Sequence, residues 1–169
     1  MKRFSIRPRL KDFNYKGYYR YFVTICTHNR SPLFQHDTLT KQLIKALRDK
    51  SDSFGFKVWT YCFMPDHLHL LLEGRFANSD LKRFVSSYKQ HTGYRYKLYV
   101  AQGFSPAQLG QLKLWQTSYY DHVLRKDEDI LDIARYILNN PTRKKLVKHF
   151  LEYKFVGSFE IETDSLMQG

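Results

Sequence analysis

The sequence predicts an α+β domain in which one antiparallel sheet carries helices on one face. Short segments rich in β-branched and aromatic residues alternate with segments whose apolar residues recur every three or four positions. The order is strand, helix, strand, strand, helix, strand, with one more helix after the last strand. A length of 169 residues and a hydrophobic content of 43% suit a single domain with a real core.

The segments with strand-like composition are Arg20–His28, Phe56–Met64, His67–Glu73 and a part of Leu114–Arg125. Polar residues mark the expected helix starts at Asp37 or Thr38, at Asn78 or Ser79, and at Asp127–Asp129. The third helix is expected to run to Asn140, where Pro141 stops it. This order is that of the ferredoxin-like split β-α-β arrangement, with a C-terminal helix added.

The composition points to a polyanionic partner. Lys and Arg number 28 against 16 Asp and Glu, which gives a net charge of +12, and 13 Tyr, 13 Phe and 2 Trp are interleaved with that charge. Nucleic acid is the usual partner of such a chain, although a basic protein without one is the alternative. Cys26 and Cys62 are expected to be free thiols. With no secretory signal and no segment of transmembrane length, a cytoplasmic protein without membrane contact is expected.

Two histidines lie two positions apart in the third expected strand, within the segment MPDHLHLLL. Alternate side chains on a strand share a face, so His67 and His69 point one way, and the opposite face carries Leu68, Leu70 and Leu72. The leucine face suits the core under the helices, and the opposite face could hold a divalent ion between two imidazoles. The alternative is a pair of ordinary half-exposed histidines. A structural zinc site is disfavoured because the two cysteines lack ligand spacing.

The third expected helix carries a tyrosine outside its apolar stripe. Tyr136 lies roughly 130° from the centre of the stripe at ~100° per residue. Asn140 follows one turn later on the same side. A phenol and an amide oxygen therefore project together from one rigid element, as a site would require. The alternative is a surface tyrosine and an asparagine that caps the end of the helix.

The segments MPDHLHLLL, LWQTSYYDHVLR and YILNNP, in this order, resemble the HUH endonuclease superfamily, in which U is a hydrophobic residue. The chain is most similar to the single-tyrosine transposases of insertion sequences, and in particular to their stand-alone relatives, the REP-associated tyrosine transposases. The resemblance covers most of the chain and implies the same ferredoxin-like fold. It implies His67 and His69 as metal ligands, Tyr136 as the nucleophile, and Asn140 as the polar residue that completes the metal site.

The resemblance also implies a reaction, in which single-stranded DNA is nicked and rejoined through a 5′-phosphotyrosine intermediate with Mg²⁺ or Mn²⁺. The expected substrate is DNA that forms a hairpin. The chain would then consist of a basic aromatic N-terminal arm over 1–19, a catalytic domain over 20–147 and a tail over 148–169. We expect a bacterial protein that associates with the nucleoid when bound to DNA. Relatives include monomers and dimers, so a homodimer stays open.

Basic residues close to aromatic ones are the expected DNA contacts, because cations follow the backbone while bases stack on rings. These residues are Arg3, Arg7, Arg9, Lys82, Arg83, Lys89, Arg95 and Lys97. Each could equally belong to an ordinary solvated face.

Several alternatives stay open. Tyr119 and Tyr120 are lesser candidates for the nucleophile. Asp121 and His122 could hydrogen-bond the metal ligands from behind, or could make ordinary strand-end hydrogen bonds. A non-catalytic nucleic-acid-binding protein of the same fold, or another HUH nuclease such as a replication initiator, are the rival functions.

Overall fold

The computed structural model describes residues 12–101 and 112–161. Its helices and strands, in chain order, are β1 (Arg20–Cys26), η1 (His28–Arg30), η2 (Leu33–Gln35), α1 (Asp37–Ser53), β2 (Phe56–Met64), β3 (His67–Gly74), α2 (Leu81–Val100), β4 (Tyr120–Val123), α4 (Ile130–Leu138), α5 (Asn140–Arg143), η3 (Phe150–Glu152) and β5 (Val156–Gly157). None of the helices in this described part combines the length and the apolarity that a membrane span requires.

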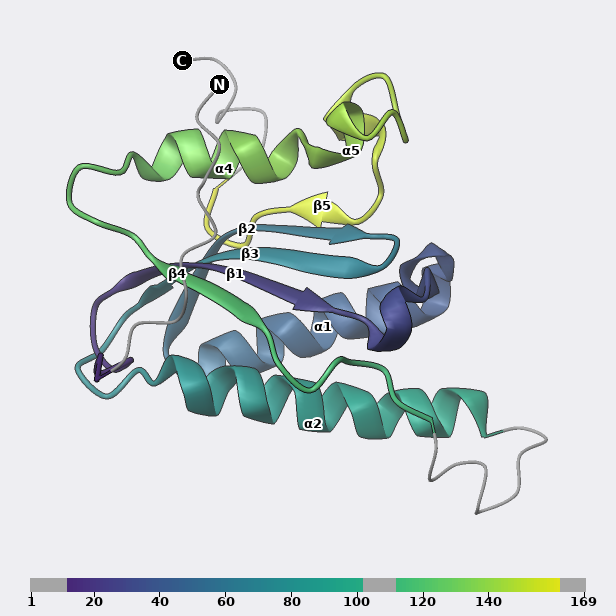
Figure 1. Cartoon of the computed structure of the whole chain (residues 1–169), viewed down its shortest axis with the longest axis horizontal. Coiled ribbons are helices and arrows are strands. Elements are labelled where there is room, and N and C mark those ends of the chain that lie inside the picture. Colours follow the sequence, from purple (N-terminus) through teal and green to yellow (C-terminus); the bar gives the residue numbers. More distant parts are fainter. Residues whose placement is uncertain (1–11, 102–111, 162–169) are drawn as a thin grey trace.

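The five strands form one antiparallel sheet in the order β4-β1-β3-β2-β5. Helices α1 and α2 cover one face of this sheet, and α4 crosses the other face (Figure 1). The first four strands and the two helices between them have the ferredoxin-like arrangement, so the predicted α+β class is confirmed. The tyrosine-bearing helix is the added element.

The register of the sheet decides which side chains share a face. In the pairing of β1 with β3, Thr24 lies opposite His69 and Cys26 lies opposite His67. Successive side chains of a strand alternate between faces, so these four residues share one face. The leucines of β3 divide accordingly, since Leu68 packs in the core under α1 and α2 and Leu71 packs under α4.

Two hydrophobic cores hold the three layers together. The larger core lies between the sheet and the helices α1 and α2. The smaller core lies between the sheet and α4, and its buried residues are Phe22, Cys62, Met64, Leu71, Ile133, Ala134, Ile137, Leu138 and Phe150. The apolar stripe of α4 therefore packs on the face of the sheet that carries the histidines, because that face is apolar except around them.

Some element boundaries differ from the sequence expectation. The cap of α2 is Asp80, whose side chain accepts a hydrogen bond from the backbone of Arg83, whereas the Ser79 hydroxyl donates to the backbone of Gly55. Pro141 does not end the helical region, because it lies in the first turn of α5, where its missing N–H costs nothing. The segment after α5 adds the edge strand β5, which the sequence pattern did not predict.

Candidate active site

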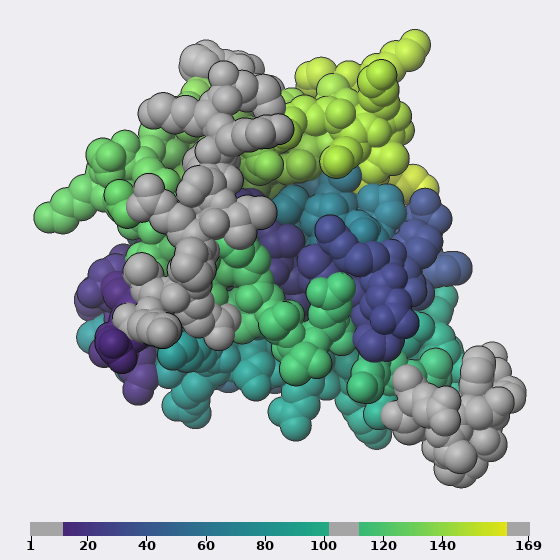
Figure 2. All heavy atoms as spheres, in the orientation of Figure 1, coloured from purple at the N-terminus to yellow at the C-terminus, as the bar shows by residue number. Residues whose placement is uncertain are grey.

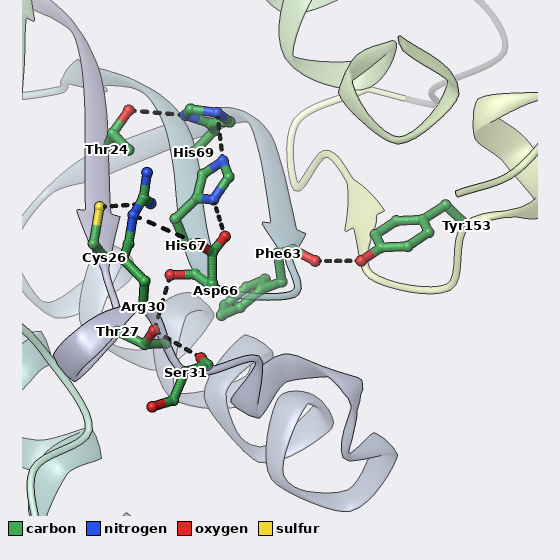
Figure 3. Close-up of polar contacts among 10 residues, drawn as sticks. All are labelled: Thr24, Cys26, Thr27, Arg30, Ser31, Phe63, Asp66, His67, His69 and Tyr153. Carbon is green, nitrogen blue, oxygen red and sulfur yellow. Dashed lines mark hydrogen bonds and ion pairs between the residues drawn. The ribbon is translucent and has the colours of Figure 1, made fainter. Parts of the chain in front are cut away.

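The imidazoles of His67 and His69 point toward a common position on the α4 face of the sheet (Figure 3). Their Nε2 atoms are 3.1 Å apart, and their ring planes are 80° apart. Alternate positions on β3 place both side chains on one face, as the sequence predicted. The two ring nitrogens therefore converge.

Each imidazole is held from behind through its other nitrogen. The His67 Nδ1–H donates to Asp66 Oδ1 at 2.5 Å, which leaves the lone pair on Nε2. The Nδ1 atom of His69 is 2.8 Å from the Thr24 hydroxyl oxygen. A hydroxyl can both donate and accept, so Thr24 fits either tautomer of His69. Partners of this kind orient metal-binding histidines and fix their tautomers.

The turn between β2 and β3 fixes the carboxylate that holds His67. The backbone carbonyl of Asp66 accepts hydrogen bonds from the backbone N–H and the hydroxyl of Thr27, both at 3.0 Å. Arg30 lies beside this turn, with its Nε 3.5 Å from Asp66 Oδ2 and its Nη1 3.1 Å from Cys26 Sγ (Figure 3).

Burial keeps both imidazoles neutral. Loss of hydration lowers the pKa of His69 to about 3, and the positive charges of Arg30, Arg143 and any protonated His67 act in the same direction. Burial also lowers the pKa of His67, although the hydrogen bond and the charge of Asp66 oppose the shift. Neutral imidazole is the form that binds metal ions, so both rings are ready to act as ligands at pH 7.

The donor set fits a divalent cation. Two nitrogen ligands at neighbouring positions of an octahedral ion, each about 2.1 Å from it, are about 3.0 Å apart. The separation of the two Nε2 atoms, 3.1 Å, is close to that value. Within residues 12–101 and 112–161, no third His, Cys, Asp or Glu joins the pair in a metal-binding cluster. A third protein ligand would thus be of another type, such as the Asn140 amide oxygen.

Tyr136 lies on the same side of the sheet as the histidines. It is half-buried on α4, and its ring meets the Phe22 ring edge-on, with centroids 6.2 Å apart. The His69 ring packs against the same phenylalanine, with centroids 5.4 Å apart. Phe22 therefore lies between the tyrosine helix and the histidine strand, and both come from one chain.

The side chain of Asn140 is buried at the start of α5. Its Nδ2 donates to the backbone carbonyls of Tyr136, at 3.0 Å, and Ile137, at 3.5 Å. The amide nitrogen of Asn140 thus satisfies carbonyls at the end of α4, although the residue at the C-cap position is Asn139. Any role as a metal ligand falls to Oδ1.

Comparison with known proteins identifies the family. Residues 15–140 match the family described as Transposase IS200 like. The chain belongs to this family. Membership in a family of transposases gives the protein an enzymatic role in DNA transposition, which the sequence motifs had predicted.

Relatives of this IS200-like transposase include the REP-associated tyrosine transposase of Escherichia coli (strain K12), which is 25% identical over 148 residues, 83% of this chain and 79% of the relative. A Haemophilus influenzae protein is 28% identical over 156 residues, 79% of this chain and 86% of the relative. A solved structure of a REP-associated tyrosine transposase bound to a REP hairpin has the same fold, with a TM-score of 0.68 and 19% identity over 89% of this chain and 82% of that one.

The predicted DNA contacts do not all lie near the histidine pair. Arg3, Arg7 and Arg9 lie outside the described residues of the transposase. The other five are on α2, which covers the opposite face of the sheet: Lys82, Arg83, Lys89, Arg95 and Lys97.

Two of these lysines on α2 contact other segments of the same chain. Lys89 donates through Nζ to three successive backbone carbonyls before β4, those of Gln116, Thr117 and Ser118. The Lys82 Nζ lies 4.8 Å from the centre of the Tyr15 ring. Lys82 and Lys89 thus have structural contacts as well as any role toward DNA.

The lesser candidates separate onto the two faces. Tyr120 packs in the smaller core beside Phe22, with ring centroids 6.3 Å apart, while Tyr119 packs against the larger core. One of the two tyrosines thus faces the histidine side, as expected. His122 Nε2 is 2.9 Å from both carboxylate oxygens of Glu128, so this histidine binds the segment that leads into α4.

Sequence reasoning missed the residues that orient the site. Asp66 directly precedes His67, so its position in the motif could have been used. The importance of Thr24 depends on the register of β1 against β3, which is a long-range pairing. The same holds for Phe22, whose ring packs against three elements of the site.

Proposed function

We propose that this protein nicks and rejoins single-stranded DNA through a covalent 5′-phosphotyrosine intermediate at Tyr136, with Mg²⁺ or Mn²⁺ held by His67 and His69. The observation that carries the proposal is the convergence of two neutral, anchored imidazoles, with Nε2 atoms 3.1 Å apart, on the face that also carries Tyr136. Without a cation the same separation suits a hydrogen bond between the two rings, and a bound cation would take its place by using the lone pairs of both Nε2 atoms.

The reaction is a pair of phosphoryl transfers. The Tyr136 hydroxyl oxygen attacks the scissile phosphorus and loses its proton to solvent, and the bond to the 3′ oxygen breaks, so that a 3′-hydroxyl leaves. The phosphodiester bond energy is kept in the tyrosine ester. A second 3′-hydroxyl can then attack the ester and release the tyrosine without ATP. A divalent cation, when bound, withdraws electron density from the phosphate.

The comparisons support a hairpin as the DNA substrate. The solved neighbour is described as a REP-associated tyrosine transposase bound to a REP hairpin, and the E. coli relative has the same name. The net charge of +12 provides the attraction that any DNA substrate requires. We therefore propose a hairpin with a single-stranded flank.

A covalent-adduct assay tests the nucleophile. The protein is incubated with 3′-labelled and 5′-labelled hairpin DNA and Mn²⁺, and denaturing gels are read for a protein-bound label. The adduct should carry the DNA on the 3′ side of the nick, should be absent with EDTA, and should be lost in Tyr136→Phe. Tyr120→Phe is the matched control, because its ring packs against the same Phe22. An adduct that persists in Tyr136→Phe and is lost in Tyr120→Phe would refute the assignment.

A mixing assay tests whether the tyrosine acts within its own chain. Tyr136 and the histidines share one face of a single chain, which supports action in cis. We expect no adduct when Tyr136→Phe is mixed with the double variant His67→Ala/His69→Ala. Adduct formation in the mixture would instead show a dimer that exchanges the tyrosine helix.

A further inference from the structure

Three exposed cations from two different segments lie near enough to the histidine pair for their charges to act on its imidazoles. Arg143 and Lys144 belong to the end of α5, and Arg30 belongs to η1. Figure 2 shows the α5 region, in yellow-green, and the η1 segment, in violet, on one side of the molecule with the blue end of the β2–β3 hairpin between them. We call these three residues the cationic flank.

Arg143 connects the cationic flank to the nucleophile. Its guanidinium carbon lies 4.4 Å from the centre of the Tyr136 ring, and that ring is held edge-on by Phe22 on another side. Among the described residues, no carboxylate forms an ion pair with Arg143 or Lys144. A stacked guanidinium keeps its in-plane N–H donors available for another ligand, because stacking uses only the face of the group.

Arg30 reaches the other end of the histidine pair from a strained backbone. Asn29 and Arg30 have φ angles of 53° and 55°, in the left-handed region that residues with a side chain rarely adopt. Strain of this kind persists where the surroundings fix it, and it clusters at functional sites. Here the strained turn directs Arg30 to the carboxylate that holds His67, with Nε 3.5 Å from Asp66 Oδ2.

The charged groups near the histidine pair are mostly positive, which favours the binding of an anion. The described groups whose charges shift the pKa values of the two imidazoles are Asp66, Arg30, Arg143 and Lys144. One carboxylate thus faces three cations, and any divalent ion adds two further positive charges. A DNA strand offers one negative charge per phosphate, and guanidinium groups bind phosphate oxygens through paired N–H donors.

We propose that Arg30 and Arg143 bind backbone phosphates of the DNA strand at the cleavage site, and that Arg143 does so while stacked on the nucleophile, so that it also positions the Tyr136 ring. This inference rests on the proposed function and extends it to substrate binding. It adds contacts on the histidine face to the basic residues of α2 that the sequence singled out.

Metal-free DNA binding tests the phosphate contacts separately from cleavage. Arg30→Gln, Arg143→Gln and the double variant are made in the Tyr136→Phe background, and fluorescence anisotropy with labelled hairpin DNA is measured in EDTA over a range of KCl concentrations. Lys45→Gln is the matched control for net charge, because Lys45 is exposed on α1 and paired with Asp49. Melting temperatures of all variants are compared to identify any variant that fails to fold.

Each arginine variant should weaken binding about tenfold at 0.1 M salt and reduce the slope of log K against log salt by about 0.7, with the double variant losing about 1.4. Lys45→Gln should leave the slope unchanged. Folded arginine variants that bind within twofold of the parent, with the same slope, would overturn the proposal.

Arg143→Lys separates charge from stacking. This variant, with Tyr136 intact, should keep the salt slope, because the positive charge remains. It should form the adduct at least tenfold more slowly at saturating DNA, because an ammonium group lacks the planar surface that holds the ring. An unchanged adduct rate would refute the positioning role of Arg143.

The two proposals fail in different ways. If the protein with Tyr136 intact formed no adduct while the arginine variants lost DNA affinity, the nicking reaction would be refuted and the phosphate contacts would remain supported. If the arginine variants formed the adduct normally and bound DNA as tightly as the parent protein, the phosphate contacts would be refuted and the nicking reaction would remain supported.

Discussion

Two glycines of this transposase should respond in opposite ways to the same substitution. Gly74 ends β3, the strand that carries the histidines, and a Cβ atom there would lie 1.9 Å from the backbone oxygen of Gly17. Gly93 lies inside α2, and a Cβ atom there would meet nothing within 4 Å. Gly74→Ala should therefore destabilise the protein and Gly93→Ala should stabilise it.

The expected size follows from the contacts that must move. Gly74→Ala has to push the Gly17 backbone away, which costs about 1–3 kcal/mol as overpacking. The movement also strains the hydrogen bonds from Gly74 N–H to Tyr19 O, at 3.0 Å, and from Gly17 N–H to Ser79 O, at 2.9 Å, each worth about 1 kcal/mol. Alanine also lowers the conformational entropy of the unfolded chain, which offsets about 0.4–1 kcal/mol of this cost. The net loss in the free energy of unfolding is about 2–4 kcal/mol.

Gly93→Ala has no such cost and should gain about 0.5–1 kcal/mol from helix propensity. Urea unfolding followed by circular dichroism gives the free energy of unfolding of both variants and the wild type, and equal m-values make the comparison valid. A free energy of unfolding for Gly74→Ala within about 0.5 kcal/mol of the wild-type value would show that the close approach of Gly17 does not limit this position. A destabilised Gly93→Ala would equally contradict the reasoning.

Three further predictions concern the site and its support. Asp66→Asn should lower the affinity for Mn²⁺ about 10–100-fold, measured by calorimetry, because His67 loses the carboxylate that fixes its tautomer; an unchanged affinity would argue against this role. Lys89→Met should reduce the free energy of unfolding by about 1–3 kcal/mol in urea, because three backbone carbonyls before β4 lose their shared donor; equal stability would leave those contacts without energetic importance. Burial raises the pKa of both thiols, so their alkylation should accelerate only at alkaline pH. The half-exposed Cys26 should react with iodoacetamide in the native protein and the buried Cys62 only after unfolding, as peptide mass mapping would show; rapid labelling of native Cys62 would contradict its burial.

Local periodicity in the sequence was sufficient to predict most elements and the direction of the site residues on them. Strand and helix patterns repeat every two or about 3.6 residues, so they can be identified from neighbours in the chain, and they gave the order of the elements and the α+β class. The same rule placed His67 and His69 on the face opposite Leu68, Leu70 and Leu72. It also placed Tyr136 off the apolar stripe of its helix, and the structure shows that ring half-buried against Phe22.

Contacts between distant segments were decided by the tertiary structure. The sequence alone did not determine that α4 packs on the histidine face, because an apolar stripe fits either face of a sheet that is apolar on both. The anchor of His69 at Thr24 needed the register of β1 against β3, and the capture of Lys89 by the segment before β4 needed α2 to lie beside it. Periodicity gives each side chain a direction on its own element, and only the packing of the layers decides what it meets there.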